Sequence, residues 1–211
     1  MSKLVFGFDP GGIDKFGCAA WWPESGELEC VTLSYVDEVL HWARQVADGV
    51  TPCAAGLDTL LFWQTGPSGW RGADEWLRAR YRAVQASVMH PNGLQGSMSI
   101  QGPCLAFGLR DLWPSLPLNE THPKVLWASL YSWEYPRIWP EATGPALWCE
   151  AVGMPVDALG DEHQLDAALS AWAAWQGVSG SWAHNLFNEV ARRQTRPNRT
   201  FVDDVTYYWP E

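Results

Sequence analysis

Four acidic residues lie at positions where the sequence pattern predicts the end of a strand or the interior of a helix. Asp9 and Asp58 each close a short apolar run, Glu120 ends a third strand-like segment, and Asp166 lies in the clearest helical pattern. Carboxylates at strand ends suit hard divalent cations, because Mg²⁺ takes oxygen ligands and keeps several waters. Two such ions about 3.5–4 Å apart can activate water and stabilise the leaving oxygen of a phosphodiester. We therefore expect a site for Mg²⁺ or Mn²⁺, with two ions.

Each of these acids also has an ordinary structural interpretation. With 24 acidic residues in the chain, any one of them is most often solvated at the surface. Asp9 would then cap the turn that follows it, and Asp58 would be the N-cap of the next segment. Asp166 would lie on the exposed side of an amphipathic helix, for which Asp161 is the expected N-cap.

Cationic side chains near these acids are candidates for substrate binding. His163 is three residues from Asp166, so the two share a helix face, and it would act as a general base or contact substrate. The alternative is an exposed histidine in the first turn. A group of arginines suits phosphate through bidentate contacts, although Asp74 and Glu75 would pair with Arg78 along a helix. The arginines are Arg71, Arg78, Arg80 and Arg82, of which Arg71 and Arg78 are the substrate-binding candidates.

Composition limits the classes of protein to which the chain can belong. Among 211 residues, 24 acids outnumber 14 Lys and Arg, which gives a net charge of −10 and argues against a sequence-blind nucleic-acid binder. The 47% of hydrophobic residues suffice for a core. No apolar run is long enough for a membrane span, and no secretory signal is evident. Five scattered cysteines without a C-x-x-C pair indicate reduced thiols and a cytoplasmic location.

Tryptophan is unusually frequent, with 15 residues in the chain. Such rings could stack on bases of a single strand, but they more often build a core. Trp127, Trp172 and Trp175 fall on helical apolar stripes and are expected to be packed. Trp63 and Trp70 are the better candidates for stacking.

The elements that would position the four acids follow from the hydrophobic pattern. Three strand-like segments separated by turn residues predict an antiparallel meander of two hairpins. A helix beginning near Asp37 then leads to the apolar run that ends at Asp58, which is the crossover that a parallel pairing requires. The meander strands are expected at 4–9, 17–22 and 28–36.

The rest of the chain is less regular. Residues 66–117 are expected to form an irregular insertion with a helix over 73–85 and a long loop over 90–102. Gly, Ser and Gln enrich that loop, and loops of this length are often functional. Further helices are predicted at 124–133, 161–175 and 182–193, with a final strand within 201–209.

Several motifs, in this order and spacing, resemble the ribonuclease H-like fold. They are similar to a predicted-nuclease family with that fold, domain of unknown function 429, over about residues 5 to 175. The motifs are Gly7-Phe8-Asp9-Pro10-Gly11-Gly12, Gly56-Leu57-Asp58, the segment from Arg71 to Arg78, Glu120-Thr121-His122-Pro123 and the segment from Asp161 to Ala168.

The resemblance implies an α/β fold in one domain over 1–211. Its mixed sheet would hold an antiparallel three-strand meander followed by parallel strands, with helices on its faces. Asp9, Asp58, Glu120 and Asp166 would be the metal-binding and catalytic acids. Asp9 would bridge the ions, Asp58 and Asp166 would complete the ligands, and Glu120 would hold a water or the second ion.

Three functions follow from these patterns. The first is a metal-dependent phosphodiester hydrolase that acts on nucleic acid or a nucleotide. The second is a nucleotide-binding phosphotransferase of the actin-like ATPase type, because such proteins also begin with a strand and a turn like Asp9-Pro-Gly-Gly12. The third is a non-catalytic interaction module on the same fold. A protein partner and the oligomeric state stay open, and no membrane association is expected.

Overall fold

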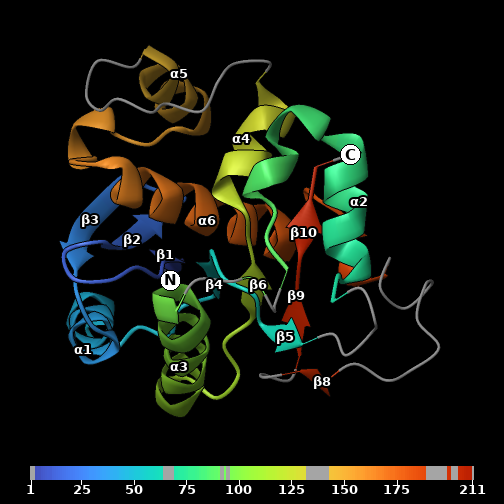
Figure 1. Cartoon of the computed structure of the whole chain (residues 1–211). Coiled ribbons are helices and arrows are strands. Elements are labelled where there is room, and N and C mark those ends of the chain that lie inside the picture. Colours follow the sequence, from blue (N-terminus) through green and yellow to red (C-terminus); the bar gives the residue numbers. More distant parts are fainter. Residues whose placement is uncertain are drawn as a thin grey trace.

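The computed structural model describes residues 3–63, 69–90, 93, 96–131, 143–188, 199–200 and 204–210. Its centre is a mixed sheet with the strand order β3-β2-β1-β4-β6-β9 (Figure 1). The strands are β1 (Val5–Asp9), β2 (Phe16–Trp22), β3 (Glu27–Leu33), β4 (Ala54–Leu57), β6 (Leu118–Glu120) and β9 (Val205–Thr206). Strands β1, β2 and β3 pair antiparallel, whereas β1–β4, β4–β6 and β6–β9 pair in parallel. The predicted fold class, a meander followed by parallel strands, is confirmed.

Helices cover both faces of the sheet, so the molecule has three layers (Figure 1). The helices are α1 (Val36–Ala47), α2 (Gly72–Arg80), α3 (Gly96–Leu112), α4 (Pro123–Leu130), α5 (Thr143–Val152) and α6 (Glu162–Val178). Short 3-10 helices follow α2 and α5, namely η1 (Arg82–Ser87) and η3 (Val156–Ala158). Two small ribbons pair β7 (His184–Asn185) with β10 (Tyr208–Trp209) and β5 (Phe62–Trp63) with β8 (Arg199–Thr200).

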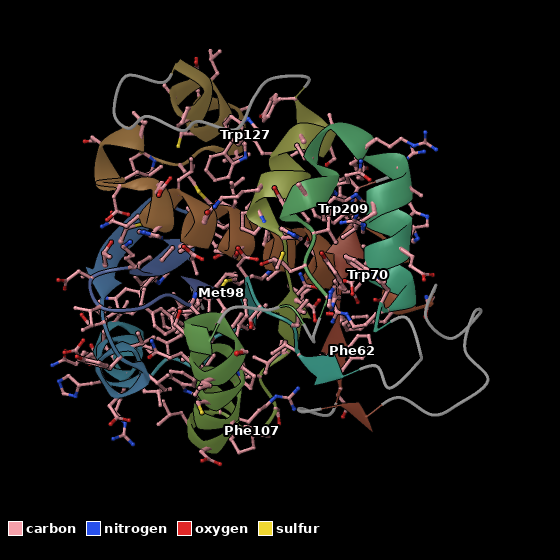
Figure 2. All side chains as sticks on the ribbon, in the orientation of Figure 1. Phe62, Trp70, Met98, Phe107, Trp127 and Trp209 are labelled. Atoms are coloured by element: carbon pink, nitrogen blue, oxygen red, sulfur yellow. The ribbon has the colours of Figure 1, made fainter. Side chains whose placement is uncertain are left out.

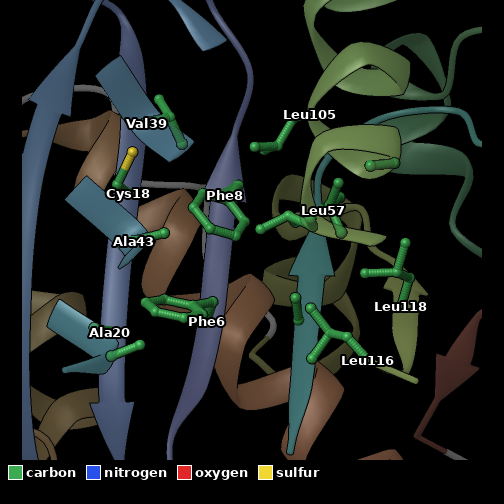
Figure 3. Close-up of a cluster of buried hydrophobic side chains, with 14 of the residues drawn as sticks. Phe6, Phe8, Cys18, Ala20, Val39, Ala43, Leu57, Leu105, Leu116 and Leu118 are labelled. Atoms are coloured by element: carbon green, nitrogen blue, oxygen red, sulfur yellow. The ribbon is translucent and has the colours of Figure 1, made fainter. Parts of the chain in front are cut away.

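Alternation along β1 divides the core into two parts. Phe6 and Phe8 point to one face and pack with α1 and α3 (Figure 3). Val5 belongs to the other face, where α6 and the buried Trp127 and Trp148 cover the sheet. Successive residues of a strand point to opposite sides, so a run buried on both faces reads as continuously apolar. This explains why the β1 segment shows no polar alternation in the sequence.

The predicted tryptophan core is present. Trp127 is fully buried, and Trp172 and Trp175 are partly buried against the same cluster. Figure 2 places Trp127 and Trp209 within the molecule and Phe107 at its surface. The guanidinium of Arg78 covers the ring of Trp70 at 4.4 Å from the centroid. The side chain of Trp63, the other stacking candidate, lies outside the described residues.

The structure corrects several element boundaries. The helix expected over 73–85 ends at Arg80, where Tyr81 takes a non-helical backbone with φ −114° and ψ 63°. Much of the loop expected over 90–102 belongs to α3. Tertiary packing overrides the weak helix propensity there, because Gly102, with no Cβ, lies against Thr59 and the apolar stripe beyond it packs on the sheet.

The C-terminal prediction is also corrected. A helix was expected over 182–193, but His184–Asn185 pairs as a strand with Tyr208–Trp209. Residues 189–193 lie outside the described part. The final strand expected within 201–209 is found as β9 and β10, and 201–203 are not described.

Neither spanning helices nor paired cysteines are found in what the structure describes. No helix there is long and apolar enough to cross a bilayer. Cys18 and Cys149 are buried free thiols, and Cys30, Cys53 and Cys104 are also free.

Candidate metal centre

Three of the four predicted acids meet at one edge of the sheet. Asp9 ends β1, Asp58 directly follows β4, and Asp166 lies in the second turn of α6. One carboxylate oxygen from each lies within 4.8 Å of the other two. Asp9 and Asp166 are buried, with 8% and 2% of their surface exposed, and Asp58 is half-buried. We call these three residues the aspartate cluster.

Parallel pairing explains how two of these acids meet. Residues Val5 to Phe8 pair in register with Ala54 to Leu57. The amide of Asp58 donates a hydrogen bond of 2.9 Å to the carbonyl of Phe8. The residues that follow each strand therefore leave the sheet side by side, as carboxyl ends of parallel strands do.

Three glycines bring α6 close enough to contribute the third acid. A Cβ on Gly7 would lie 1.9 Å from the carbonyl oxygen of Ala167, and one on Gly56 would lie 1.9 Å from that of Ser170. On Gly17 it would lie 2.0 Å from the carbonyl oxygen of His163. Any side chain at these positions would push the helix outward. The glycines thus seat α6 directly on the sheet backbone and hold Asp166 beside the strand ends.

Burial makes the aspartate cluster electrostatically costly. Burial, together with the neighbouring charges of Asp9 and Asp166, holds the pKa of Asp58 well above its usual value. Burial also raises the pKa of Asp9, although the hydrogen bond with His163 works against this rise. Close carboxylates in a desolvated site disfavour each other's ionisation. A bound cation would relieve this repulsion.

Two cationic side chains border the cluster. The Nδ1 atom of His163 lies 2.8 Å from Oδ2 of Asp9, and this hydrogen bond raises the pKa of the imidazole despite its partial burial. The Nζ atom of Lys124 lies 3.9 Å from Oδ2 of Asp166. Burial lowers the pKa of Lys124, but the charges of the three aspartates outweigh that effect, so the net shift is upward. The hydrogen-bond partner of His163 is Asp9, and its role as a general base or substrate contact stays a prediction.

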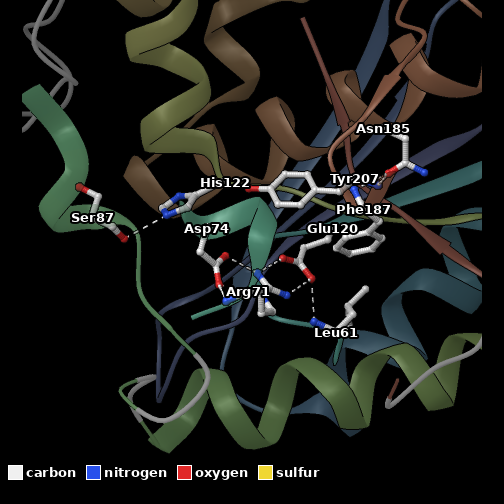
Figure 4. Close-up of polar contacts among 9 residues, drawn as sticks. All are labelled: Leu61, Arg71, Asp74, Ser87, Glu120, His122, Asn185, Phe187 and Tyr207. Carbon is white, nitrogen blue, oxygen red and sulfur yellow. Dashed lines mark hydrogen bonds and ion pairs between the residues drawn. The ribbon is translucent and has the colours of Figure 1, made fainter. Parts of the chain in front are cut away.

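Glu120, the fourth predicted metal ligand, does not join the aspartate cluster. Its two carboxylate oxygens accept hydrogen bonds from Arg71, at 2.5 and 3.0 Å, and from the amide of Leu61 at 2.8 Å (Figure 4). Arg71 also pairs with Asp74 through Nε at 2.8 Å and Nη2 at 2.6 Å. We call Arg71, Asp74 and Glu120 the arginine cluster.

The arginine cluster is closed to a ligand, because its one guanidinium pairs with both carboxylates and leaves a formal charge of −1 when both are ionised. Arg71 is fully buried, with its guanidinium 4.5 Å from the ring centroid of Phe62. The paired carboxylates outweigh the effect of burial and raise the pKa of Arg71, so it stays charged. The substrate contact expected of Arg71 is therefore replaced by a structural ion pair, because its donors are committed inside the protein.

The hydrogen bonds found for Arg78 connect two segments of the chain and do not involve Asp74 or Glu75, the acids one turn before it. Its Nη1 donates to the carbonyls of Gln85 and Val88, at 2.5 and 3.2 Å. It therefore ties α2 to η1 and to the segment that follows. The structure shows no substrate contact for Arg78, and that role stays a prediction.

Lys124 and an adjoining pocket were missed by the sequence analysis. The pocket has a volume of about 240 Å³, and Asp58 and Lys124 belong to its lining. A lysine four residues after a strand-end acid was a usable signal, because Pro123 at the first helical position predicts that the helix begins there. The pocket itself is formed by segments that only the tertiary structure brings together.

Comparison with known proteins adds no family assignment. No protein-family model matches the sequence, and no significant match is found among curated proteins or solved structures. The resemblance to a predicted-nuclease family therefore stays a prediction, and the functional argument rests on the site.

Proposed function

We propose that this protein is a divalent-metal-dependent phosphodiester hydrolase whose centre is the aspartate cluster. The observation that carries the proposal is the convergence of three carboxylates, from β1, the end of β4 and α6, within 4.8 Å. Surface acids commonly lie near one another, but two of these three are buried. Buried acids of like charge need a compensating partner.

The donor set fits a hard divalent cation. Asp9, Asp58 and Asp166 would hold Mg²⁺ or Mn²⁺ through oxygen atoms, the ligands that these ions prefer. When bound, such an ion supplies a Lewis acid for a phosphoryl oxygen and lowers the pKa of water. The chain would contribute a preformed cluster on rigid elements, since α6 rests directly on the sheet at Gly7 and Gly56.

The local charges favour one resident ion. When ionised, the three aspartates together with the ammonium of Lys124 carry a net charge of −2, which a single divalent cation balances. The second ion expected from the sequence stays a prediction, and its ligands would have to include oxygens of a bound phosphate beside those of the aspartate cluster.

The neighbouring cations have separate roles in this proposal. His163 holds the carboxylate of Asp9 in position and can keep or release a proton at Nδ1. Lys124 keeps an ammonium beside Asp166 while nearly half of its side chain stays exposed, so it can approach the charge of an arriving phosphate. Its position favours phosphate binding without the broad basic surface that the chain lacks.

The net charge of −10 restricts the substrate. A long nucleic acid would be repelled outside the immediate surroundings of the metal and Lys124. We therefore propose a nucleotide or a nucleic-acid end as substrate. A cytoplasmic location is part of the same proposal, and the free thiols are compatible with it.

Cleavage assays with one substitution test this function. Labelled DNA and RNA should be cleaved with Mn²⁺ or Mg²⁺ and not with EDTA, and Asp9→Asn should abolish that cleavage while the fold persists. Asp111→Asn, at an exposed acid at the end of α3, is the control and should cleave normally. Wild-type rates in Asp9→Asn would contradict the proposal.

Two other outcomes would favour the alternative functions. Thermal stabilisation by ATP without cleavage would favour the phosphotransferase. Absence of metal binding would favour a non-catalytic module.

A further inference from the structure

The pocket beside the aspartate cluster is contiguous with the proposed metal centre. Asp58 contributes both to the cluster and to the pocket, and Lys124 lines the pocket while lying 3.9 Å from Asp166. A phosphate held by the metal and Lys124 would therefore carry its substituent toward this pocket.

Part of the pocket lining is aromatic and apolar. This part comprises His122 and Tyr207 together with Met89 and Met98. A hydrogen bond of 3.0 Å to the carbonyl of Ser87 fixes the His122 ring, so Nε2 is the donor (Figure 4). Flat rings and polarisable thioethers are surfaces on which nucleobases pack.

Tyr207 adds a polar group to this part of the lining. Its ring packs between Phe187 and Trp209, and Figure 4 shows its hydroxyl end directed toward His122. Among the residues that the structure describes, no hydrogen bond to that hydroxyl is found. Burial and the nearby acids raise the pKa of Tyr207 well above its usual value, so the hydroxyl stays a neutral donor and acceptor.

The volume limits the occupant. About 240 Å³ equals the space of about eight waters at roughly 30 Å³ each. This suits one nucleobase or nucleoside and excludes a stacked series of bases. Asp58, whose carboxylate belongs to the aspartate cluster, also lines the pocket, which disfavours a second anion there and favours a neutral group that carries N–H or O–H donors.

We propose that this pocket binds the single nucleoside unit next to the scissile phosphate. It would thus select a mononucleotide derivative or a strand end over the interior of a duplex. This inference rests on the proposed function for the position of the phosphate. The binding of the nucleoside, in contrast, depends on the pocket alone.

Binding to the metal-free protein separates the two proposals. Saturation-transfer NMR in EDTA with adenosine, guanosine, cytidine and uridine should show that at least one nucleoside binds wild type. Ala86→Trp places a large side chain at the exposed rim of the pocket and should weaken that binding at least tenfold. The control is Ala83→Trp, an exposed alanine of the same short helix that does not line the pocket. Tyr207→Phe keeps the ring and should weaken binding several-fold.

Absence of nucleoside binding by wild type would overturn the inference. Equal binding by wild type and Ala86→Trp would also overturn it, because the nucleoside would then occupy another site. Asp9→Asn should bind the nucleoside like wild type, since Asp9 does not line the pocket. Loss of binding in Asp9→Asn with its fold intact would place the nucleoside at the metal centre instead.

Two chromogenic phosphodiesters extend the test to turnover with Mn²⁺. Thymidine 5′-(p-nitrophenyl phosphate) carries a nucleoside, and bis(p-nitrophenyl) phosphate does not. In both, water adds to phosphorus as the bond to p-nitrophenolate breaks. Ala86→Trp should raise KM at least tenfold for the nucleoside substrate only, whereas Asp9→Asn should abolish both reactions. Equal effects of Ala86→Trp on KM for both substrates would contradict a nucleoside subsite. Nucleoside binding without hydrolysis of either substrate would contradict only the proposed function.

Discussion

The aspartate cluster and the arginine cluster are both buried groups of carboxylates, but they are balanced differently. In the arginine cluster, Arg71 bonds both of its acids at distances of 3.0 Å or less. In the aspartate cluster, Nζ of Lys124 lies 3.9 Å from Oδ2 of Asp166, and Nδ1 of His163 forms a hydrogen bond of 2.8 Å with Oδ2 of Asp9.

This difference separates a structural polar group from a candidate site. Both carboxylates of the arginine cluster bind directly to the guanidinium of Arg71, and removing that buried cation is expensive. Three carboxylates brought together in a desolvated site disfavour each other's ionisation and lower the stability of the metal-free protein. We infer that the arginine cluster stabilises the fold, and that the aspartate cluster lowers the stability of the metal-free protein because its residues are placed to bind a ligand.

Breaking the arginine cluster should give the largest loss of stability. Arg71→Met would leave Asp74 and Glu120 buried without their cation, which costs about 3–5 kcal/mol of unfolding free energy. Arg80→Met, at an exposed arginine of the same helix, should cost less than about 1 kcal/mol. Urea unfolding followed by circular dichroism at neutral pH measures both, and similar losses would remove the distinction between the clusters.

Lifting α6 from the sheet should damage the aspartate cluster selectively. Gly17→Ala adds a Cβ that would meet the carbonyl of His163 at 2.0 Å, so we expect a loss of about 1–3 kcal/mol and weaker metal binding. Gly12→Ala, with open space at its Cβ position, is the control and should change neither. Urea unfolding of both variants measures the change in stability, and Mn²⁺ titration measures the change in metal affinity. Unchanged metal affinity in a folded Gly17→Ala protein would show that the seat of α6 is unimportant.

The raised pKa of Asp58 predicts a pH dependence of stability in EDTA. The folded protein holds this proton more tightly than the unfolded chain, so stability falls as the pH rises above 3.8 toward the folded pKa. The loss is about 1.4 kcal/mol for each unit of pKa difference. Asp58→Asn should remove this part of the slope. Thermal unfolding of both proteins across the acidic and neutral range measures it, and identical pH profiles would contradict the assignment.

The smallest expected effect is on His163. Its pKa should lie above 6.5 in the metal-free protein and fall when Mg²⁺ binds, because the ion competes for the charge of Asp9. Asp9→Asn should lower the pKa without metal, since it removes the negative charge beside the imidazole. Histidine NMR titrations test both changes. If neither Mg²⁺ nor the Asp9→Asn substitution changes the pKa of His163, the side chains of His163 and Asp9 do not interact in solution.

The sequence was sufficient for much of the framework. The short apolar runs predicted the three-strand meander, the crossover helix and the parallel strand that ends beside Asp58, because burial on two faces and turn residues leave local signals. The same logic brought Asp9 and Asp58 together. The face of α6 that carries Asp166 was decided by Gly7 and Gly56, whose partners are more than a hundred residues away.

Glu120 shows why local pattern was insufficient. Its position at the end of β6 resembles that of Asp9 at the end of β1. Only the tertiary structure brings Arg71, the N-cap of α2, to 2.5 Å from it. α3 was missed for a related reason. Its Gly- and Ser-rich start has low helix propensity, and packing against the sheet and α1 decides its conformation.

Mn²⁺ titration calorimetry on wild type, Asp58→Asn and Glu120→Gln tests the central claim most directly. Wild type should bind Mn²⁺, Asp58→Asn should bind at least about tenfold more weakly because it loses one of the three ligands, and Glu120→Gln should keep the wild-type affinity if near-UV circular dichroism shows it folded. Absence of Mn²⁺ binding by wild type would contradict a metal site at the aspartate cluster. The account would equally be contradicted if Asp58→Asn bound like wild type, or if a folded Glu120→Gln lost affinity as Asp58→Asn is expected to.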